Sequence, residues 1–123
     1  MNSRQRVRAA LNHEAPDRAP IDLGSTDVTG IHACALDRLR KALGLEPRMV
    51  KVFEPMMMLG LVEPDLLHEI GGDLVGIHPP VTLLGYWNRD WKPWMLPDGT
   101  RVLVGGGLAV NRGDHGTVYA YPQ

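Results

Sequence analysis

Cysteine is almost absent from this sequence, because Cys34 is the single thiol among 123 residues. One cysteine cannot form an intramolecular disulfide. Without a Cys-x-x-Cys pair the sequence also lacks the usual cysteine signature of a metal or redox site. We therefore expect no metal ligands and no cofactor within this chain.

Neither sign of charge predominates, since 13 Lys and Arg residues oppose 14 Asp and Glu residues, for a net charge of −1. There is no basic excess to hold a polyanion, so we expect no nucleic-acid partner. Long apolar runs are missing too. No stretch approaches the roughly 18 consecutive apolar residues of a membrane span, and the first six residues lack the apolar centre of a signal peptide. These absences predict a cytoplasmic protein without a membrane partner.

Glycine and proline, in contrast, are abundant, at 14 and 10 residues. That density predicts many turns and short elements, and it excludes a simple helical bundle. The length is sufficient for one ordinary domain. It falls well short of the about 250 residues of a closed (β/α)₈ barrel.

Residues 1–84 alternate between helix and strand patterns. Asn2 and Gln5 predict a capping box at the start of a first helix, and Pro64 suits the first turn of a later one. Apolar spacing predicts a helix over 31–43, ended by Gly44. The other predicted elements are strands over 20–24, 49–53 and 73–77 and a helical turn over 56–59. The near-continuous apolar run of 73–77 is typical of a parallel sheet that is covered on both faces.

Residues 85–123 have the pattern of an antiparallel β-meander or hairpin insertion within the same domain. The turn signal Pro97-Asp98-Gly99-Thr100 leads into a strand over 101–104. Further strands are predicted over 108–110 and 117–121, the last by its β-branched and aromatic content. The fold class expected is α/β.

Polar residues follow two of the predicted strands and are the candidates for a site. If the strands over 20–24 and 73–77 are parallel, the residues beyond their carboxyl ends converge. Two histidines and a carboxylate at adjacent strand ends could bind a metal or shuttle a proton. His78 is the catalytic candidate, and the candidates for substrate binding are Asp22, Thr26, Asp27 and His32.

Structural roles compete with this functional interpretation. Thr26 and Asp27 are residue types that cap helices, and His32 could lie on the surface of the helix that follows. Asp22 could be a buried, hydrogen-bonded carboxylate. For His78 the two interpretations are equally weighted, because a polar residue at the end of a buried strand needs a partner.

Several motifs together resemble one known family. The opening resembles the N-terminal signature of the uroporphyrinogen decarboxylase family, in which a short helix ends in His-Glu and Pro-Asp-Arg-x-Pro leads into the first strand. The residues that carry the resemblance are Arg4 to Pro20, Asp37 to Leu45, Gly72 to Ile77, Leu96 to Thr100 and Tyr119 to Gln123. The family has a (β/α)₈ barrel, so the resemblance implies that this chain is the N-terminal part of an incomplete TIM barrel with an antiparallel β-meander.

The resemblance also separates two branches of that family. True uroporphyrinogen decarboxylases of porphyrin biosynthesis carry an arginine-rich segment after the first strand. The matching residues here, 24–30, hold no cation and would clamp carboxylates poorly. The resemblance therefore points to the corrinoid-dependent methyltransferase-like branch, whose full-length members use zinc and a corrinoid.

On this interpretation the chain is an N-terminal fragment that is inactive alone. Its implied partners are a complementary barrel chain, a second copy of itself, or a corrinoid protein. The alternative from another class is a non-enzymatic assembly module that docks a complementary chain through exposed edges and apolar faces. A free-standing uroporphyrinogen decarboxylase is a third interpretation, disfavoured by length and by the missing arginines.

Overall fold

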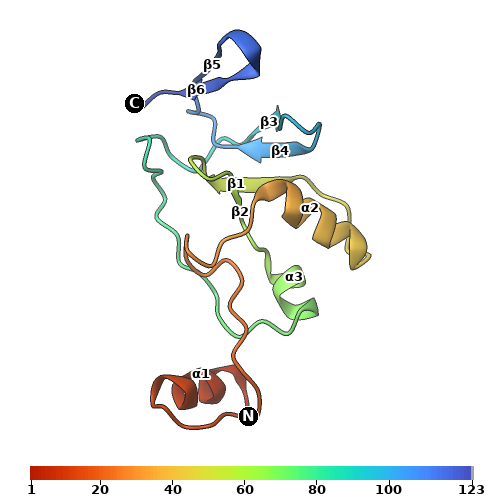
Figure 1. The fold of residues 1–123 in the computed structure, drawn as a ribbon, viewed down its shortest axis with the longest axis vertical. Helices are drawn as coiled ribbons and strands as arrows, with labels where there is room; N and C mark the ends of the chain where they lie inside the picture. The colour runs from red at the N-terminus through yellow and green to blue at the C-terminus, as the bar shows by residue number, and fades with distance from the viewer. Residues whose placement is uncertain (123) are drawn as a thin grey trace.

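The computed structural model describes residues 1–122 as three helices, six strands and one short 3₁₀ turn (Figure 1). The helices are α1 (Ser3–Leu11), α2 (Ala33–Ala42) and α3 (Pro64–Glu69). The strands are β1 (Val50–Glu54), β2 (Leu59–Gly60), β3 (Lys92–Met95), β4 (Arg101–Val104), β5 (Val110–Arg112) and β6 (Val118–Ala120), with η1 at Asp114–Gly116. Within this part of the chain, no helix is both long and apolar enough to cross a membrane.

The central sheet has four strands in the order β2-β1-β4-β3. β1 pairs with β4 in parallel, with Val50 opposite Val102 and Val52 opposite Val104. The two outer pairs, β1 with β2 and β3 with β4, are antiparallel. Since side chains alternate along a strand, these four valines share one face of the sheet, and all four are buried. β5 and β6 form a separate antiparallel hairpin.

Helix α2 covers the buried face of the sheet at β1 and β2. Leu36 and Ala33 are almost completely buried there. Gly60 of β2 allows the close approach, because a Cβ at Gly60 would lie 2.7 Å from Leu36 Cδ2 and 3.2 Å from Ala33 Cα. The rest of the core includes Leu66 of α3 and three residues beyond residue 85, namely Tyr86, Leu96 and Leu108.

Helix α1 lies apart from this body, at the lower end of the molecule in Figure 1. Its start is the predicted capping box: Gln5 N donates to Asn2 Oδ1 at 2.9 Å, and Asn2 N donates to Gln5 Oε1 at 3.0 Å. Residues 14–30 lead irregularly from α1 into the body, and residues 71–80, which follow α3, pass beside them. One backbone hydrogen bond, of the kind that joins paired strands, holds these two stretches together: Asp73 N donates to Ile21 O at 2.9 Å.

The predicted N-terminal part of a (β/α)₈ TIM barrel is therefore wrong. That fold requires successive parallel strands joined by helices, whereas this is a small mixed sheet with one parallel pair, accompanied by a hairpin. The predicted strands over 20–24 and 73–77 form no ladder. Their apolar composition favours extended backbone, but a strand also needs a neighbour whose backbone groups are free. The parallel pair forms instead between two segments rich in β-branched residues, 50–54 and 101–104.

Other elements are closer to prediction. The helices at 31–43 and after Pro64 and the hairpin strand at 101–104 are confirmed, and Gly44 has a φ of +66° beyond the end of α2. The helical turn predicted over 56–59 is wrong. Residues 55–58 form a turn between β1 and β2 instead, and Leu59 already belongs to β2. In this turn Glu54 Oε1 and Oε2 accept from the amides of Met56 and Met57 at 3.0 and 2.8 Å.

Candidate functional site

The predicted site residues from the first loop are bound to their own neighbours. Asp22 accepts from the amide of Ser25 at 3.1 Å and from its hydroxyl at 2.6 Å. Thr26 exchanges hydrogen bonds with Thr29, its amide donating to Thr29 Oγ1 at 3.1 Å. Asp27 is exposed, and its carbonyl accepts from Gly30 N at 3.3 Å. The loop is thus a turn closed by its own side chains, ahead of α2.

His32 caps helix α2, a role that the sequence patterns assigned to its hydroxyl and carboxyl neighbours. Its Nδ1 accepts from Cys34 N at 3.3 Å and lies 3.1 Å from Cys34 Sγ. A hydrogen bond from the backbone of Thr100 lowers the pKa of Asp98, and its contact with the Cys34 side chain acts in the same direction. The imidazole of His32 thus bonds both the amide and the thiol of Cys34 at the start of α2.

His78 lies away from His32, beside the end of β1. Its ring stacks on Phe53, with the ring centroids 3.9 Å apart. A Cβ at Gly76 would lie 2.7 Å from His78 Nε2 and 2.8 Å from Ser25 O, so the imidazole and the turn of Asp22 flank Gly76. The structure thus brings His78 near the first loop, and it places His32 at the start of α2 with different neighbours.

An ion-pair cluster near α1, which the sequence patterns did not single out as a site, joins residues that are far apart in the sequence. We call it the clasp, and it consists of Arg6, Asp17, Arg18 and Asp73. The Asp73 carboxylate is completely shielded from solvent and accepts from Arg6 Nη1 at 2.6 Å, Arg18 Nη1 at 2.7 Å and Ile21 N at 3.0 Å. Arg6 also donates from Nε and Nη2 to the two oxygens of Asp17, at 2.7 and 2.9 Å.

The charges of the clasp balance, because two carboxylates face two guanidinium groups. The hydrogen bond from Ile21 N and those from both arginines hold the pKa of Asp73 well below its usual range. The hydrogen bond from Arg6 does the same for the pKa of Asp17. Both acids thus remain charged at neutral pH and keep α1 joined to residues 17–21 and 71–73. The sequence signal for this cluster was present in Pro16-Asp17-Arg18 and Gly72-Asp73, but nothing in the sequence shows that the two segments meet.

A second polar cluster occupies the carboxyl end of β1. Glu54 and Tyr86 are both nearly buried, and Asn88 Nδ2 donates to Phe53 O at 2.9 Å. Within the described residues the Tyr86 hydroxyl and Asn88 Oδ1 have no hydrogen-bond partner. Burial, together with the nearby charge of Glu54, raises the pKa of Tyr86 to about 12. The cluster is adjacent to Gly105, where a Cβ would lie 2.8 Å from the Tyr86 ring.

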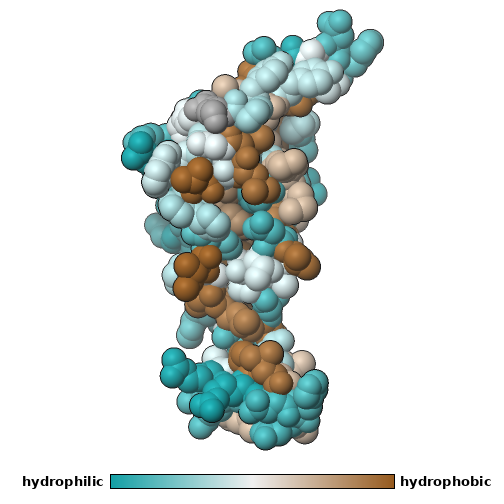
Figure 2. Space-filling view, turned by 90° about the vertical axis from the view of Figure 1, so that its left-hand side faces the viewer, coloured by the Kyte–Doolittle hydropathy of each residue, from teal (hydrophilic) through white to brown (hydrophobic). Residues whose placement is uncertain are grey.

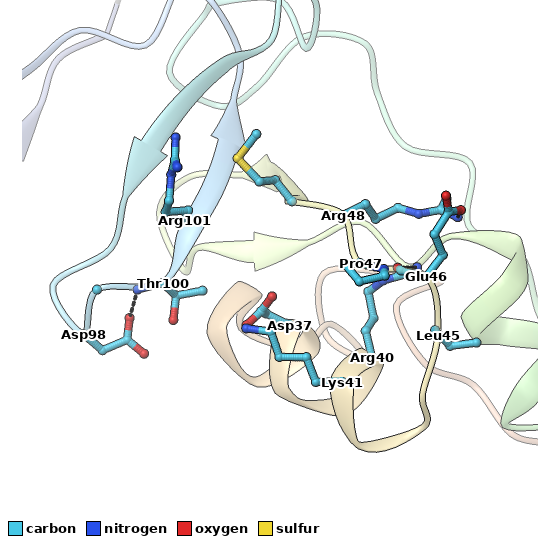
Figure 3. Close-up of a pocket in the computed structure, with 12 residues that line it drawn as sticks. Asp37, Arg40, Lys41, Leu45, Glu46, Pro47, Arg48, Asp98, Thr100 and Arg101 are labelled. Atoms are coloured by element: carbon cyan, nitrogen blue, oxygen red, sulfur yellow. Dashed lines mark hydrogen bonds and ion pairs between the residues drawn. The ribbon is translucent and has the colours of Figure 1, made fainter.

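An open cleft of about 540 Å³ lies between α2, residues 45–49 and the turn that joins β3 to β4 (Figure 3). Its charges are largely paired with one another. Arg40 donates to both oxygens of Asp65 at 3.0 and 2.8 Å, and Lys41 bonds Asp37 at 2.6 Å. The Arg101 side chain rises away from α2 (Figure 3). The cleft therefore offers polar walls with few uncommitted charges.

The described part of the chain contains no group of three His, Cys, Asp or Glu side chains that could hold a metal ion. In comparisons with known proteins, no family model, no curated protein and no solved structure matches this chain. The resemblance to the uroporphyrinogen decarboxylase family thus stays a prediction that rests on the motifs themselves.

Proposed function

We propose that this chain is the N-terminal part of an enzyme of the uroporphyrinogen decarboxylase family, of the corrinoid-dependent methyltransferase-like type, and that it is inactive alone. The clasp is the observation that supports this proposal. Asp17 and Arg18 belong to the opening motif of the resemblance, and Asp73 belongs to the later Gly72-Asp73 motif. Residues of two motifs that are distant in the sequence thus meet in one ion-pair cluster.

In such an enzyme the clasp would hold two backbone segments of this chain, residues 17–21 and residues 71–73, next to each other. The clasp fixes residues 17–21 beside residues 71–73, which sets the loop of Asp22 next to Gly76 and His78. Zinc in this family activates a thiol that accepts the methyl group. The described residues do not fit a zinc site, so we propose no zinc chemistry for them. His78 stays the catalytic candidate, and the candidates for substrate binding stay Asp22, Thr26, Asp27 and His32.

Co-expression tests the proposal directly. The chain is produced with a methyltransferase of this family from which the corresponding N-terminal part has been removed, and methyl transfer from methylcobalamin to a thiol is measured. We expect activity from the pair and none from either part. Asp73→Asn should abolish it by breaking the clasp, and Asp90→Asn, at an exposed surface carboxylate, is the matched control. Methyl transfer by this chain alone, or no activity from the intact pair, would overturn the proposal.

A non-enzymatic assembly module that docks a complementary chain is the second candidate function. It is favoured by an apolar strip along residues 74–87, where Val75, Ile77 and Leu83 are at least three-quarters exposed. Figure 2 shows brown side chains gathered on this side of the molecule. The co-expression experiment separates the candidates, because calorimetric binding of the second part without methyl transfer supports the module alone. Decarboxylation of uroporphyrinogen by the pair would instead indicate the porphyrin branch.

A further inference from the structure

Residues 74–78 have the side-chain pattern of a strand without belonging to a sheet. Val75 is 78% exposed and Ile77 is 97% exposed, whereas Leu74, Gly76 and His78 are half-buried. The half-buried side lines a small cavity of about 30 Å³ together with Leu61, Val62 and Leu67. Alternation with a period of two is the pattern of a strand with one face packed. Here the other face presents two β-branched apolar side chains to solvent.

The backbone of this segment is also unpaired. Between Leu74 and His78, no amide or carbonyl bonds another backbone group in the described chain. The preceding amide, of Asp73, points toward Ile21 O. In an extended chain, successive amides alternate in direction, so an extended backbone over 74–78 would direct the amides of Leu74, Gly76 and His78 away from residue 21. Those unpaired groups are the ones that a second strand would bond.

The segment has natural limits at both ends. Asp73 has already used its amide and its carboxylate within the molecule. Pro79 has no amide to donate and is followed by Pro80. A ladder on this edge therefore extends over residues 74–78 and stops.

The pattern within those limits is symmetric about Gly76. If two copies pair in antiparallel orientation with Gly76 opposite Gly76, each Val75 lies opposite an Ile77 of the other copy. Cross-strand pairs of β-branched residues stabilise such a ladder. Gly76 carries no side chain at the two-fold axis, and the nearest charged residue, Asp73, is neutralised by Arg6 and Arg18.

We propose that the occupant of this edge is a second copy of the chain, bound through an antiparallel pairing of residues 74–78 across a two-fold axis. The interface is isologous, as in most homodimers. A single strand pair is marginal in water by itself, so the dimer is expected to be weak and to depend on protein concentration. The inference does not depend on the enzyme proposed above, since the surface exists in this chain alone.

Sedimentation equilibrium across a range of protein concentrations tests the dimer. The wild-type chain should shift from monomer to dimer. Ile77→Lys and Val75→Lys should each raise the dissociation constant by at least about tenfold, because they place like charges across the two-fold axis. Val28→Lys is the matched control, at a site that is 94% exposed in a different loop, and it should dimerise as wild type. A wild-type chain that stays monomeric, or equal weakening by Val28→Lys, would overturn the proposal.

Amide hydrogen exchange gives a second readout that a nonspecific apolar contact would not produce. On dimerisation the amides of Leu74, Gly76 and His78 should become protected, while those of Val75 and Ile77 should not. Uniform protection, or none, contradicts the register. A dimer that passes these tests while the co-expressed pair lacks methyl transfer refutes only the enzyme proposal. A chain that remains monomeric yet restores methyl transfer refutes only this inference.

Discussion

The contact between Leu36 of α2 and Gly60 of β2 allows a quantitative test of how α2 covers the sheet. Leu36 is 1% exposed. Truncation of a buried leucine to alanine removes its transfer free energy and leaves a cavity, so Leu36→Ala should cost about 3 kcal/mol of unfolding free energy. For a chain of this size that loss lowers the melting temperature by about 10 °C. Leu11→Ala is the control, because Leu11 is 75% exposed at the end of α1 and should cost well under about 1 kcal/mol.

Gly60→Ala makes the test specific to this contact. The added Cβ would lie 2.7 Å from both Leu36 Cδ2 and Val50 Cγ1 and 3.2 Å from Ala33 Cα. Overpacking of this kind costs about 1–3 kcal/mol. When Leu36 is already alanine, one of those three clashes is gone, so the double variant should be more stable than the sum of the two losses predicts.

The assay is urea unfolding of the wild type, Leu36→Ala, Gly60→Ala and the double variant, analysed as a double-mutant cycle. We expect a favourable coupling of about 1 kcal/mol. Losses that add to within about 0.4 kcal/mol would show that the two residues do not touch. A cost for Leu36→Ala no larger than that for Leu11→Ala would refute the placement of α2 on the sheet.

Three further predictions concern ionisation and helix capping. The pKa of Tyr86 is raised to about 12 by burial, so the folded state favours the neutral phenol. The unfolding free energy should fall as the pH rises from about 10 to 12, and absorbance titration should show one late tyrosine that is absent from Tyr86→Phe. The hydrogen bond from Arg40 lowers the pKa of Asp65 to about 2. This stabilisation is complete above the unfolded value of about 4 and disappears as the pH falls toward 2, so Asp65→Asn should flatten the acid limb of a urea-unfolding series. Asn2→Ala removes the cap that bonds Gln5 N and should destabilise α1 by about 1 kcal/mol, measured as faster amide exchange in that helix.

Local signals in the sequence predicted much of the secondary structure. The capping box of Asn2 and Gln5, Pro64 at the first turn of α3 and Gly44 after α2 each act within a few residues of their own position. Residue composition also located β1, and the turn signal at 97–100 located β4. In each case the physical cause lies within one turn or one strand, so the sequence contains the information needed.

The arrangement in space and the polar clusters could not be predicted in this way. Residues 73–77 have the composition of a buried strand, yet whether a strand forms depends on a neighbour elsewhere in the chain. The pairing of β1 with β4 and the bond between Arg6 and Asp73, 67 positions apart, are likewise properties of the folded chain. The sequence named His78 and Asp22 as candidates. It gave no sign that in the folded chain Gly76 is flanked by the His78 ring and by the turn that holds Asp22.

The parallel pairing of β1 with β4 also sets the order in which the chain can fold. While the protein is synthesised, α2, β1 and β2 emerge long before β4. Val50 and Val52 therefore stay without their partner strand until residues 101–104 have been made. Pairings between distant segments form slowly because a long loop must close first. A nascent chain at that stage exposes an apolar strand edge of the kind that chaperones protect. The pairing of β1 with β4 also makes the central sheet depend on β4. Cleavage of the backbone in the turn around Gly99 would therefore leave β1 and β2 on one fragment and β4 on the other.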